Sequence, residues 1–359
     1  NLVYDNLRKK LALVTILAHS NRSIIVSPLL VRFPLCKIAS FAEGAAKNEL
    51  LAILGINSNY NVNIYNCYTD FKRIITTSRD MDLILLNKIF VNYTNDINPM
   101  FMKGNTSFGV QVDKVGYNFP TTAVSFINRW YIRIIDVTWE FPFDIRLTRH
   151  VKFHHQNGNA SMVPMMTKIH SFFYYDDMMN TLFDNTLIIL LQIVHNIKLA
   201  AFGLSVTLVI PRTTKALQDF LHVLTINPDY LTEIYKQMSV ETINLKLPRF
   251  KIKTNIEWNK ILYKIGVKQI FNETHSGLNA ILKENITNYN VYLSKMKQKN
   301  FIHVDEMGIY RQPVIPGEVI LHGPETHVIA DHPFYFRINL NTDRNTQWEL
   351  FTGVYYGPE

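Results

Sequence analysis

Two short segments near the C-terminus decide the fold: Val304-Asp305-Glu306-Met307-Gly308 and Asp331-His332-Pro333-Phe334. The chain between them begins Ile309-Tyr310-Arg311-Gln312-Pro313-Val314-Ile315-Pro316 and continues Gly317-Glu318-Val319-Ile320-Leu321-His322-Gly323-Pro324. This stretch is rich in bulky side chains and is interrupted by three prolines. Proline fixes the backbone and cannot donate to a strand ladder, so the composition predicts a stiff loop.

Both segments resemble the borders of the reactive loop in the serpin family. Further segments match that family in its order along the chain: Val26-Ser27-Pro28, Ala42-Glu43-Gly44-Ala45-Ala46, Asn87-Lys88-Ile89-Phe90-Val91, Trp139-Glu140-Phe141-Pro142-Phe143, Val163-Pro164-Met165-Met166, Leu245-Lys246-Leu247-Pro248-Arg249-Phe250, Ser276-Gly277-Leu278 and Leu350-Phe351-Thr352-Gly353-Val354. By these matches the chain is identified as a member of the serpin superfamily with an atypical, proline-containing hinge.

The resemblance implies an α+β serpin fold. We expect a large central mixed β-sheet with two smaller sheets, about eight or nine helices, and an exposed reactive-centre loop. With 359 residues, 47% of them hydrophobic, the chain can bury a large core and has no long flexible linker. We therefore expect a single serpin domain over residues 1–359, with the loop region at 309–330.

Periodicity supports an α+β mixture without help from the resemblance. Apolar residues recur at helical spacing over 2–17 and 34–54, whereas 83–91 and 206–210 have the character of strands. The apolar stretch from Thr186 to Ile210 is interrupted by polar side chains, which favours two buried strands over membrane insertion.

The family's usual mechanism places demands on the hinge, for which the candidate residues are Glu306, Gly308, Ile309, Arg311 and Pro313. A protease cleaves the loop, and the N-terminal half then inserts as a new strand in the largest sheet. Burying Arg311 without a partner costs several kcal/mol, and proline is essentially excluded from central strands. We therefore expect insertion to be slow or absent.

Counting from Gly308 as in the family places the bait at Leu321, His322 and Gly323. Leucine at the penultimate position suits a papain-like cysteine protease better than a trypsin-like enzyme. A stiff loop lowers the entropy cost of binding, so we favour a reversible inhibitor with a rigid bait. The alternatives are a non-inhibitory carrier or interaction protein, and a conventional suicide inhibitor of serine proteases.

Two departures from the family pattern concern the sheet. Only residues 131–138 separate Trp130 from Trp139, too few for the rest of a helix and a central strand. Either part of both elements is lost or a stretch is omitted. In addition, Gln298 precedes Lys299 where the family usually has histidine, although glutamine can keep a hydrogen bond.

The sequence gives little indication of catalysis. His150, His154, His155 and His170 form a loose group without the spacing of a metal site, and we expect no metal or cofactor. The chain has no nucleophile elbow and no phosphate-binding glycine loop, so we expect an inhibitor rather than an enzyme.

Several features favour a secreted, extracellular glycoprotein, which we expect to be a monomer. The chain starts at Asn1 without a leader, as a mature secreted protein would. Whether Cys36 and Cys67 pair is left open. Glycosylation acceptor motifs occur at six positions: Asn21, Asn92, Asn105, Asn159, Asn272 and Asn285.

The net charge of +8 indicates an acidic partner, for which a sulfated glycan is the first candidate. The densest basic run comprises Lys246, Arg249, Lys251 and Lys253, and a second run comprises Lys295, Lys297 and Lys299. No base-stacking module accompanies these charges, so we do not expect nucleic acid as a partner.

Overall fold

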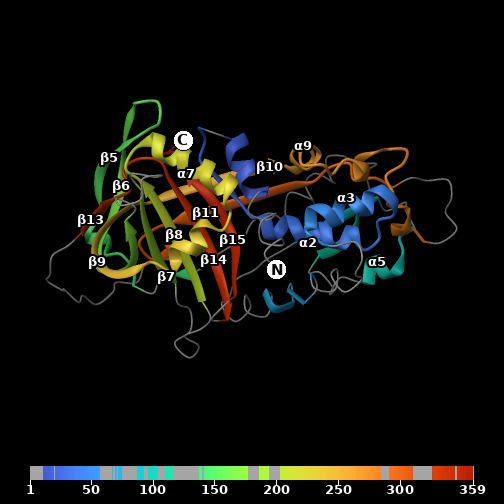
Figure 1. Cartoon of the computed structure of the whole chain (residues 1–359), viewed down its shortest axis with the longest axis horizontal. Coiled ribbons are helices and arrows are strands. Elements are labelled where there is room, and N and C mark those ends of the chain that lie inside the picture. The colour runs from blue at the N-terminus through green and yellow to red at the C-terminus, as the bar shows by residue number, and fades with distance from the viewer. Residues whose placement is uncertain are drawn as a thin grey trace.

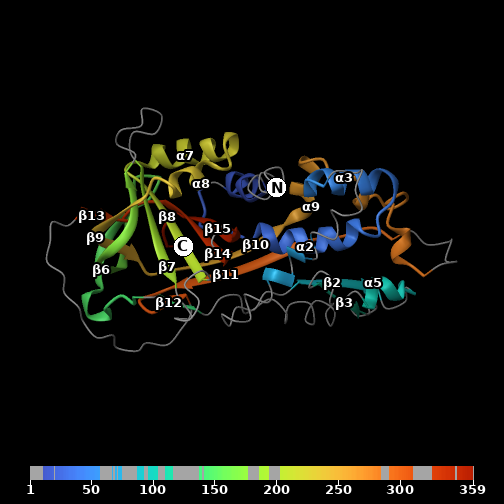
Figure 2. The same ribbon diagram turned by 60° about the horizontal axis from the view of Figure 1, so that its bottom comes forward.

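The computed structural model describes residues 11–19, 21–56, 67, 69–70, 72–74, 87–92, 96–103, 110–115, 137–139, 141–176, 186–193, 203–283, 291–309, 326–343 and 346–358. Figures 1 and 2 show most of the strands at one end of the molecule, with the helices α2, α3 and α5 at the other. Strands β10 and β11 run between the two ends.

The largest sheet has the strand order β1-β15-β14-β8-β7-β6-β9-β13, with β5 paired to β6. Among the described strand pairs of this sheet, only β13 and β9 run parallel, which makes the sheet mixed. Its strands are β1 (Ile24–Val26), β5 (Arg149–His154), β6 (Ala160–Asp176), β7 (Thr186–Ile193), β8 (Gly203–Pro211), β9 (Ser239–Pro248), β13 (Thr326–Ile329), β14 (Phe334–Asp343) and β15 (Thr346–Tyr355).

Two smaller sheets complete the predicted arrangement. The first has the order β10-β11-β12-β4, and the second pairs β2 with β3 in parallel. Their bounds are β10 (Phe250–Glu257), β11 (Lys297–Val304), β12 (Gly308–Ile309), β4 (Val137–Thr138), β2 (Asn87–Asn92) and β3 (Val110–Val115). One large mixed sheet with two smaller ones confirms the predicted α+β fold class. From the sequence we expected any insertion of the loop to occur in the largest sheet. Among the described residues, the hinge strand β12 instead belongs to the four-stranded sheet, where it pairs with β11 and β4.

The named α-helices are α2 (Pro28–Ala39), α3 (Gly44–Leu54), α5 (Pro99–Lys103), α7 (Thr214–Ile226), α8 (Tyr230–Tyr235) and α9 (Trp258–Lys264). Short 3-10 turns lie at Ile145–Leu147, Gln269–Phe271 and Asn279–Ile281. The structure is also helical over 11–18. This segment overlaps the helix predicted over 2–17 and ends one residue later. In Figure 2, α7 and α8 lie on one side of the large sheet.

The helical spacing predicted over 34–54 corresponds to two helices in the structure, which are separated by residues 40–43. α2 begins at Pro28 after Ser27, whose hydroxyl accepts a hydrogen bond from the Leu30 amide at 3.4 Å. α3 starts only at Gly44, which has a φ of 55° that favours glycine. The predicted pair of strands between Thr186 and Ile210 is confirmed, since β7 and β8 pair antiparallel. Within the described part of the chain, no helix is long and apolar enough to cross a membrane.

The core contains a close crossing at Gly353 in β15. A Cβ atom there would overlap the Ile24 carbonyl oxygen of β1 and the Phe336 ring of β14. Only glycine therefore allows the three strands β1, β15 and β14 to pack at this point. This requirement explains why the Leu350–Val354 segment has glycine at position 353.

Lys37 of α2 is buried, with an exposure of 1%. Its Nζ donates to the Val110 carbonyl oxygen at 3.3 Å and lies 5.2 Å from the centre of the Phe101 ring. Burial lowers the pKa of Lys37 to about 8. Since the unfolded chain keeps the ordinary pKa of 10.5, it binds more protons than the folded chain between these values, and stability rises with pH there.

We expect Lys37→Met to raise the free energy of unfolding at pH 7 by ~1–3 kcal/mol, because it removes a buried ammonium group. The gain should shrink between pH 8 and pH 9.5, as native Lys37 loses its proton. Urea unfolding across this range measures both effects, with the exposed Lys236→Met as the control. A variant less stable than the native chain at pH 7 would show that the Val110 hydrogen bond outweighs the cost of burial.

Candidate functional site: the loop hinge and its supports

The hinge leaves β11 through a tight turn over Asp305–Gly308. The Asp305 amide donates to the Gly308 carbonyl oxygen at 2.9 Å. The Asp305 carboxylate accepts from the amides of Met307 at 3.0 Å and Gly308 at 3.3 Å. Gly308 has a φ of 150°, which side-chain-bearing residues rarely adopt. The turn therefore depends on aspartate at its start and glycine at its end, and it directs Ile309 back against Val304 of β11.

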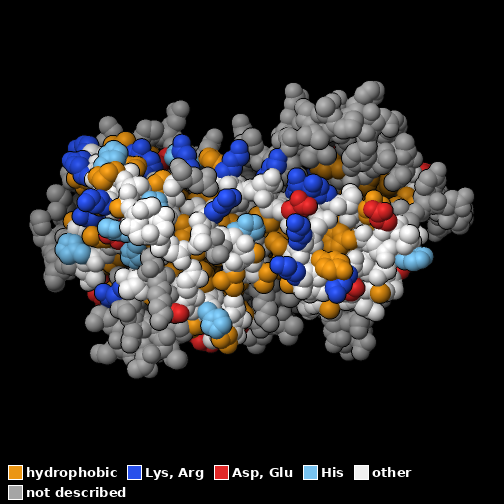
Figure 3. Space-filling view, turned by 90° about the horizontal axis from the view of Figure 1, so that it is seen from above, with side chains coloured by type: hydrophobic (Ala, Val, Ile, Leu, Met, Phe, Trp, Pro, Cys, Tyr) orange, Lys and Arg blue, Asp and Glu red, His pale blue; other side chains and the backbone are white. Residues whose placement is uncertain are grey.

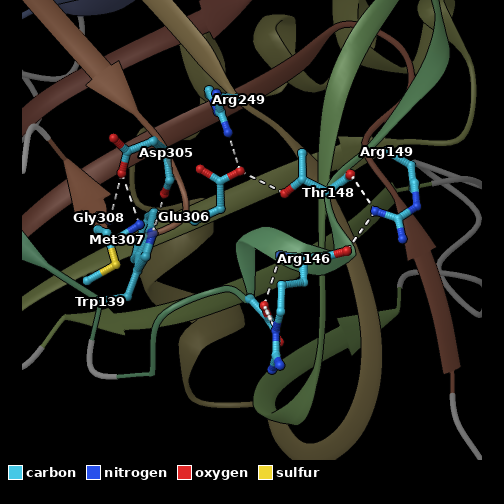
Figure 4. A network of polar contacts seen from close by, with 10 residues as sticks. Trp139, Arg146, Thr148, Arg149, Arg249, Asp305, Glu306, Met307 and Gly308 are labelled. Atoms are coloured by element: carbon cyan, nitrogen blue, oxygen red, sulfur yellow. Dashed lines mark hydrogen bonds and ion pairs between the residues drawn. The ribbon is translucent and has the colours of Figure 1, made fainter. Parts of the chain in front are cut away.

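Trp139 lies next to this turn (Figure 4). Its amide donates to the Met307 carbonyl oxygen at 2.9 Å, and its indole Nε1 donates to the Asp305 carbonyl oxygen at 2.8 Å. The Phe143 amide donates to the Glu306 carbonyl oxygen at 2.8 Å, and its ring meets the Trp139 ring edge-on at 6.1 Å. The segment after β4 therefore satisfies three consecutive carbonyl groups of the turn.

Glu306 is the charged centre of the hinge. Its side chain is buried, with 4% of the residue exposed. One carboxylate oxygen accepts from Arg249 Nη2 at 2.5 Å and from Thr148 Oγ1 at 2.7 Å, and Figure 4 shows the two donors on opposite sides of it. Arg249 lies between β9 and β10, and Thr148 precedes β5, so Glu306 joins the hinge to both sheets.

Burial by itself would raise the pKa of Glu306. The hydrogen bonds from Arg249 and Thr148 and the positive charge of Arg249 outweigh burial, so the pKa lies below the ordinary 4.5. A depressed carboxyl pKa means that the stabilisation is present above the ordinary value and is lost as the pH falls through the folded value.

A second set of hydrogen bonds fixes β11 to the start of α2. Gln298 Nε2 donates to the Ser27 carbonyl oxygen at 2.7 Å, and the Ser27 amide donates to Gln298 Oε1 at 3.2 Å. Asn300 Nδ2 donates to the Ile25 carbonyl oxygen at 2.9 Å, as does Thr254 Oγ1 at 2.7 Å. Glutamine therefore keeps the contact with Ser27, as expected from the sequence.

The structure brings together part of the predicted site. Glu306, Gly308 and Ile309 meet at the turn, but Arg311, Pro313 and the bait residues Leu321, His322 and Gly323 lie outside the described residues. Sequence reasoning missed the contacts of Trp139, Thr148 and Arg249 with the turn. Its only signal was that Trp139 and Arg249 belong to segments that match the family.

The basic candidates fall in different surroundings. Lys246 is half-buried in β9, Arg249 is paired with Glu306, and Lys251 and Lys253 are exposed on β10. Figure 3 shows further Lys, Arg and His side chains gathered at the end of the molecule that carries β5. Among the described residues, no group of three His, Cys, Asp or Glu side chains could hold a metal ion.

Cys36 of α2 and Cys67 form a disulfide, a question that the sequence left open. Of the acceptor asparagines, Asn21, Asn159 and Asn272 are exposed, and Asn92 ends β2. Asn105 and Asn285 lie outside the described residues.

Comparison with known proteins matches the sequence profile of the family described as Serpin (serine protease inhibitor) to residues 7–136 and 133–358. The chain belongs to the serpin family. Human neuroserpin is 21% identical to this serpin over 375 residues, which cover 94% of this chain and 87% of neuroserpin. Alaserpin of Manduca sexta is 22% identical, over 90% of this chain and 86% of its own.

Solved structures agree with the serpin fold. Serpin48 from the insect Tenebrio molitor superposes with a TM-score of 0.76 at 19% identity, covering 100% of this chain and 98% of its own. The complex of human thyroxine-binding globulin has a TM-score of 0.82 at 18% identity, with 100% of both chains covered.

The two segments matched by the serpin profile overlap at residues 133–136. This point lies between Trp130 and Trp139, where the sequence predicts that the chain departs from the family. Residues 116–136 are outside the described part of this serpin, so lost or omitted residues there stay a prediction.

We expect Glu306→Gln to lower the free energy of unfolding at pH 7 by ~1–3 kcal/mol, because Arg249 loses its buried ionic partner. Native stability should also fall more steeply than that of the variant as the pH drops below 4.5. Thermal unfolding at pH 7 and at pH 4 compares the two proteins, with the exposed Glu233→Gln as the control. Equal acid sensitivity of the native protein and the variant would contradict the proposed charge network.

Proposed function

We propose that this serpin is a secreted protease inhibitor that holds its target with a stiff reactive loop and inserts the loop slowly or not at all. Serpins are generally protease inhibitors, which supports the inhibitory role. The observation that carries the proposal is the register of β12, in which Ile309 lies opposite Val304 and Val137.

Continuing this antiparallel register past Ile309 would place Arg311 opposite Ile302, Pro313 opposite Asn300 and Ile315 opposite Gln298. These three β11 residues are buried, with exposures of 2%, 2% and 8%. Side chains directly opposite each other lie on the same face of a sheet. An inserted loop would therefore direct Arg311 and Pro313 to the buried face, the costlier of the two possible registers.

The energetic cost of that insertion falls on two neighbouring residues. A guanidinium group placed against Ile302 loses its hydration without gaining a described acidic partner, which costs several kcal/mol. Pro313 has no N–H to donate to a ladder. In the family's mechanism insertion competes with hydrolysis of the acyl-enzyme, which releases the protease, so a barrier of this size disfavours trapping. The proposed inhibition therefore depends on tight reversible binding of the uncleaved, stiff loop.

The preferred target is a cysteine protease, because Leu321 precedes the expected scissile bond at His322-Gly323. Secretion is supported by the acceptor motifs and by the Cys36–Cys67 disulfide, since disulfides persist mainly in oxidising compartments. The described chain offers no metal cluster, and the proposal needs no cofactor.

The first test incubates the protein with a panel of papain-like and serine proteases. We expect inhibition of a papain-like enzyme, recovery of activity on dilution, and no adduct that survives a denaturing gel. A stable adduct between the native chain and a serine protease would instead show the conventional suicide mechanism.

A hinge variant tests the physical reason for this behaviour. We expect Arg311→Thr with Pro313→Ala and Pro316→Ala to gain a denaturation-resistant adduct with a serine protease, at least tenfold above the native level. The matched control, Pro324→Ala, changes a proline beyond the bait and should gain none. If the triple variant inhibits as the native chain does and forms no adduct, the hinge is not the limiting element.

The second candidate is a carrier or interaction role without inhibition. The fold likeness to thyroxine-binding globulin, whose solved structure is a complex with thyroxine, favours it, because that fold accommodates a small ligand. Absence of inhibition across the panel, together with a one-to-one complex with a small apolar ligand, would favour this role.

A further inference from the structure

A hollow of about 320 Å³ lies where the segment before β1 meets the residues after β15. Asn21, Arg22 and Ser23 line it from the first segment. His155, directly after β5, and residues 356–358 complete the lining. Small-ligand sites in proteins begin at ~300 Å³, so this space, which we call the C-terminal hollow, is large enough for one small ring-shaped group.

Hydrogen bonds fix the walls of the C-terminal hollow. Ser23 Oγ donates to the Gly357 carbonyl oxygen at 3.1 Å and accepts from the Tyr356 amide at 2.9 Å. His155 Nδ1 lies 3.2 Å from the Tyr356 carbonyl oxygen, and its Nε2 lies 2.8 Å from Ser161 Oγ. The His155 ring also lies against Gly357, where a Cβ atom would overlap it. The hollow is therefore preformed, so filling it does not require the walls to become ordered.

Asn21 combines a position in this hollow with a glycosylation acceptor motif, Asn21-Arg22-Ser23. The residue is exposed, and its φ of 79° lies in the left-handed region, which asparagine adopts more readily than most residues. Burial raises the pKa of the Tyr356 hydroxyl, although hydrogen bonds with Gln218 and with the Asn21 backbone oppose this effect. The Tyr356 side chain therefore lies beside the backbone of the acceptor.

The other described acceptors differ from Asn21 in this respect. Asn159 and Asn272 are exposed, but neither lines the C-terminal hollow. Asn159 belongs to the turn between β5 and β6, and the Asn272 side chain accepts from the amides of Thr274 and His275 at 2.9 and 3.0 Å. Asn159 is therefore a natural control for effects that any surface glycan has on the fold.

We propose that Asn21 carries an N-linked glycan whose first N-acetylglucosamine residue occupies the C-terminal hollow. The sugar ring has apolar C–H groups that pack against Tyr356 and Pro358, and polar groups that accept hydrogen bonds from the exposed Arg22. A covalently attached sugar also has a high effective concentration at the hollow, which even weak contacts exploit. The proposal rests on the secretion proposed above.

Attachment of the glycan requires an oligosaccharide carried on a lipid diphosphate. The bond between C1 of the first sugar and the diphosphate oxygen breaks, and a bond between C1 and Asn21 Nδ2 forms. Nδ2 gives up one proton to the transferase, and the lipid diphosphate leaves. Nothing is oxidised or reduced in this transfer.

The structure also limits when this transfer can occur. Ser23, whose hydroxyl belongs to the acceptor motif, is 7% exposed and bonded to Gly357, 334 residues further along the chain. The transferase therefore reaches the motif only before the C-terminal residues dock. Once they dock, the sugar contacts both β1 and β15 segments, so it should stabilise their association.

The test compares glycoforms of the full chain, secreted from a host that makes high-mannose glycans. Peptide mass spectrometry measures occupancy at Asn21, Asn159 and Asn272. Melting temperatures are measured for the intact glycoprotein, for the glycoprotein trimmed by endoglycosidase H to a single N-acetylglucosamine at each site, and for the unglycosylated chain. Asn21→Gln and the control Asn159→Gln are measured with and without glycans, so the intrinsic cost of each substitution cancels.

We expect Asn21 to be occupied and the intact glycoprotein to melt about 2 °C above the unglycosylated chain. Trimming to the single sugar should keep this gain, because the first ring alone fills the hollow. In Asn21→Gln, the difference between the glycosylated and unglycosylated forms should vanish, whereas in Asn159→Gln it should remain.

Three results would overturn the proposal. The first is an unmodified Asn21 in a chain that carries glycans at Asn159 or Asn272. The second is a gain in melting temperature that disappears on trimming, since the outer sugars would then supply it. The third is a gain that Asn159→Gln removes as fully as Asn21→Gln does. The protease panel, run on the unglycosylated chain, tests the proposed inhibition separately, so the failure of one proposal is distinguishable from that of the other.

Discussion

The contact between Glu306 and Arg249 is the interaction on which the arrangement of the hinge depends. A carboxylate this deeply buried is tolerated only because a guanidinium and a hydroxyl satisfy it. Its two donors come from segments next to β5 and β10, so one side chain ties the start of the loop to both sheets. The backbone bonds from Trp139 then fix the turn around it, and the direction in which the loop departs is set before any residue of the bait is reached.

This anchoring bears on the family mechanism. In the proposed insertion, a loop that continued the register of β12 past Ile309 would turn Arg311 toward the buried face. The proposed barrier to insertion therefore comes from the register of the loop as well as from its composition. A shift by one residue would also move Ile309 away from its position opposite Val304 and Val137.

Much of the fold could be predicted because its signals are local or lie in matching segments. The strands β7 and β8 follow from their apolar composition, and the segment at Gly308 was placed at the border of the loop because it matches the family. The break between α2 and α3 could not be read from periodicity, since helical spacing continues across 40–43. The ion pair between Arg249 and Glu306 could not be predicted from the sequence either, because an arginine in a basic run does not indicate which distant acidic residue it contacts. Charge counting assigned Arg249 to a surface role, whereas three-dimensional contact gives it a structural one.

The disulfide between Cys36 and Cys67 bears on the contact between Ser27 and β11 at the other end of α2. It closes a loop with a sequence separation of 31, and the loop-entropy estimate for such a cross-link is about 3 to 4 kcal/mol at 25 °C. The first residues of α2 follow Ser27, and Gln298 of β11 forms two hydrogen bonds with the backbone of Ser27. Forming the bond therefore restricts the unfolded chain around α2, the helix that begins next to this contact. Reduction of this bond would therefore lower the stability of the segment that carries the contact between Ser27 and Gln298, and with it the support of β11.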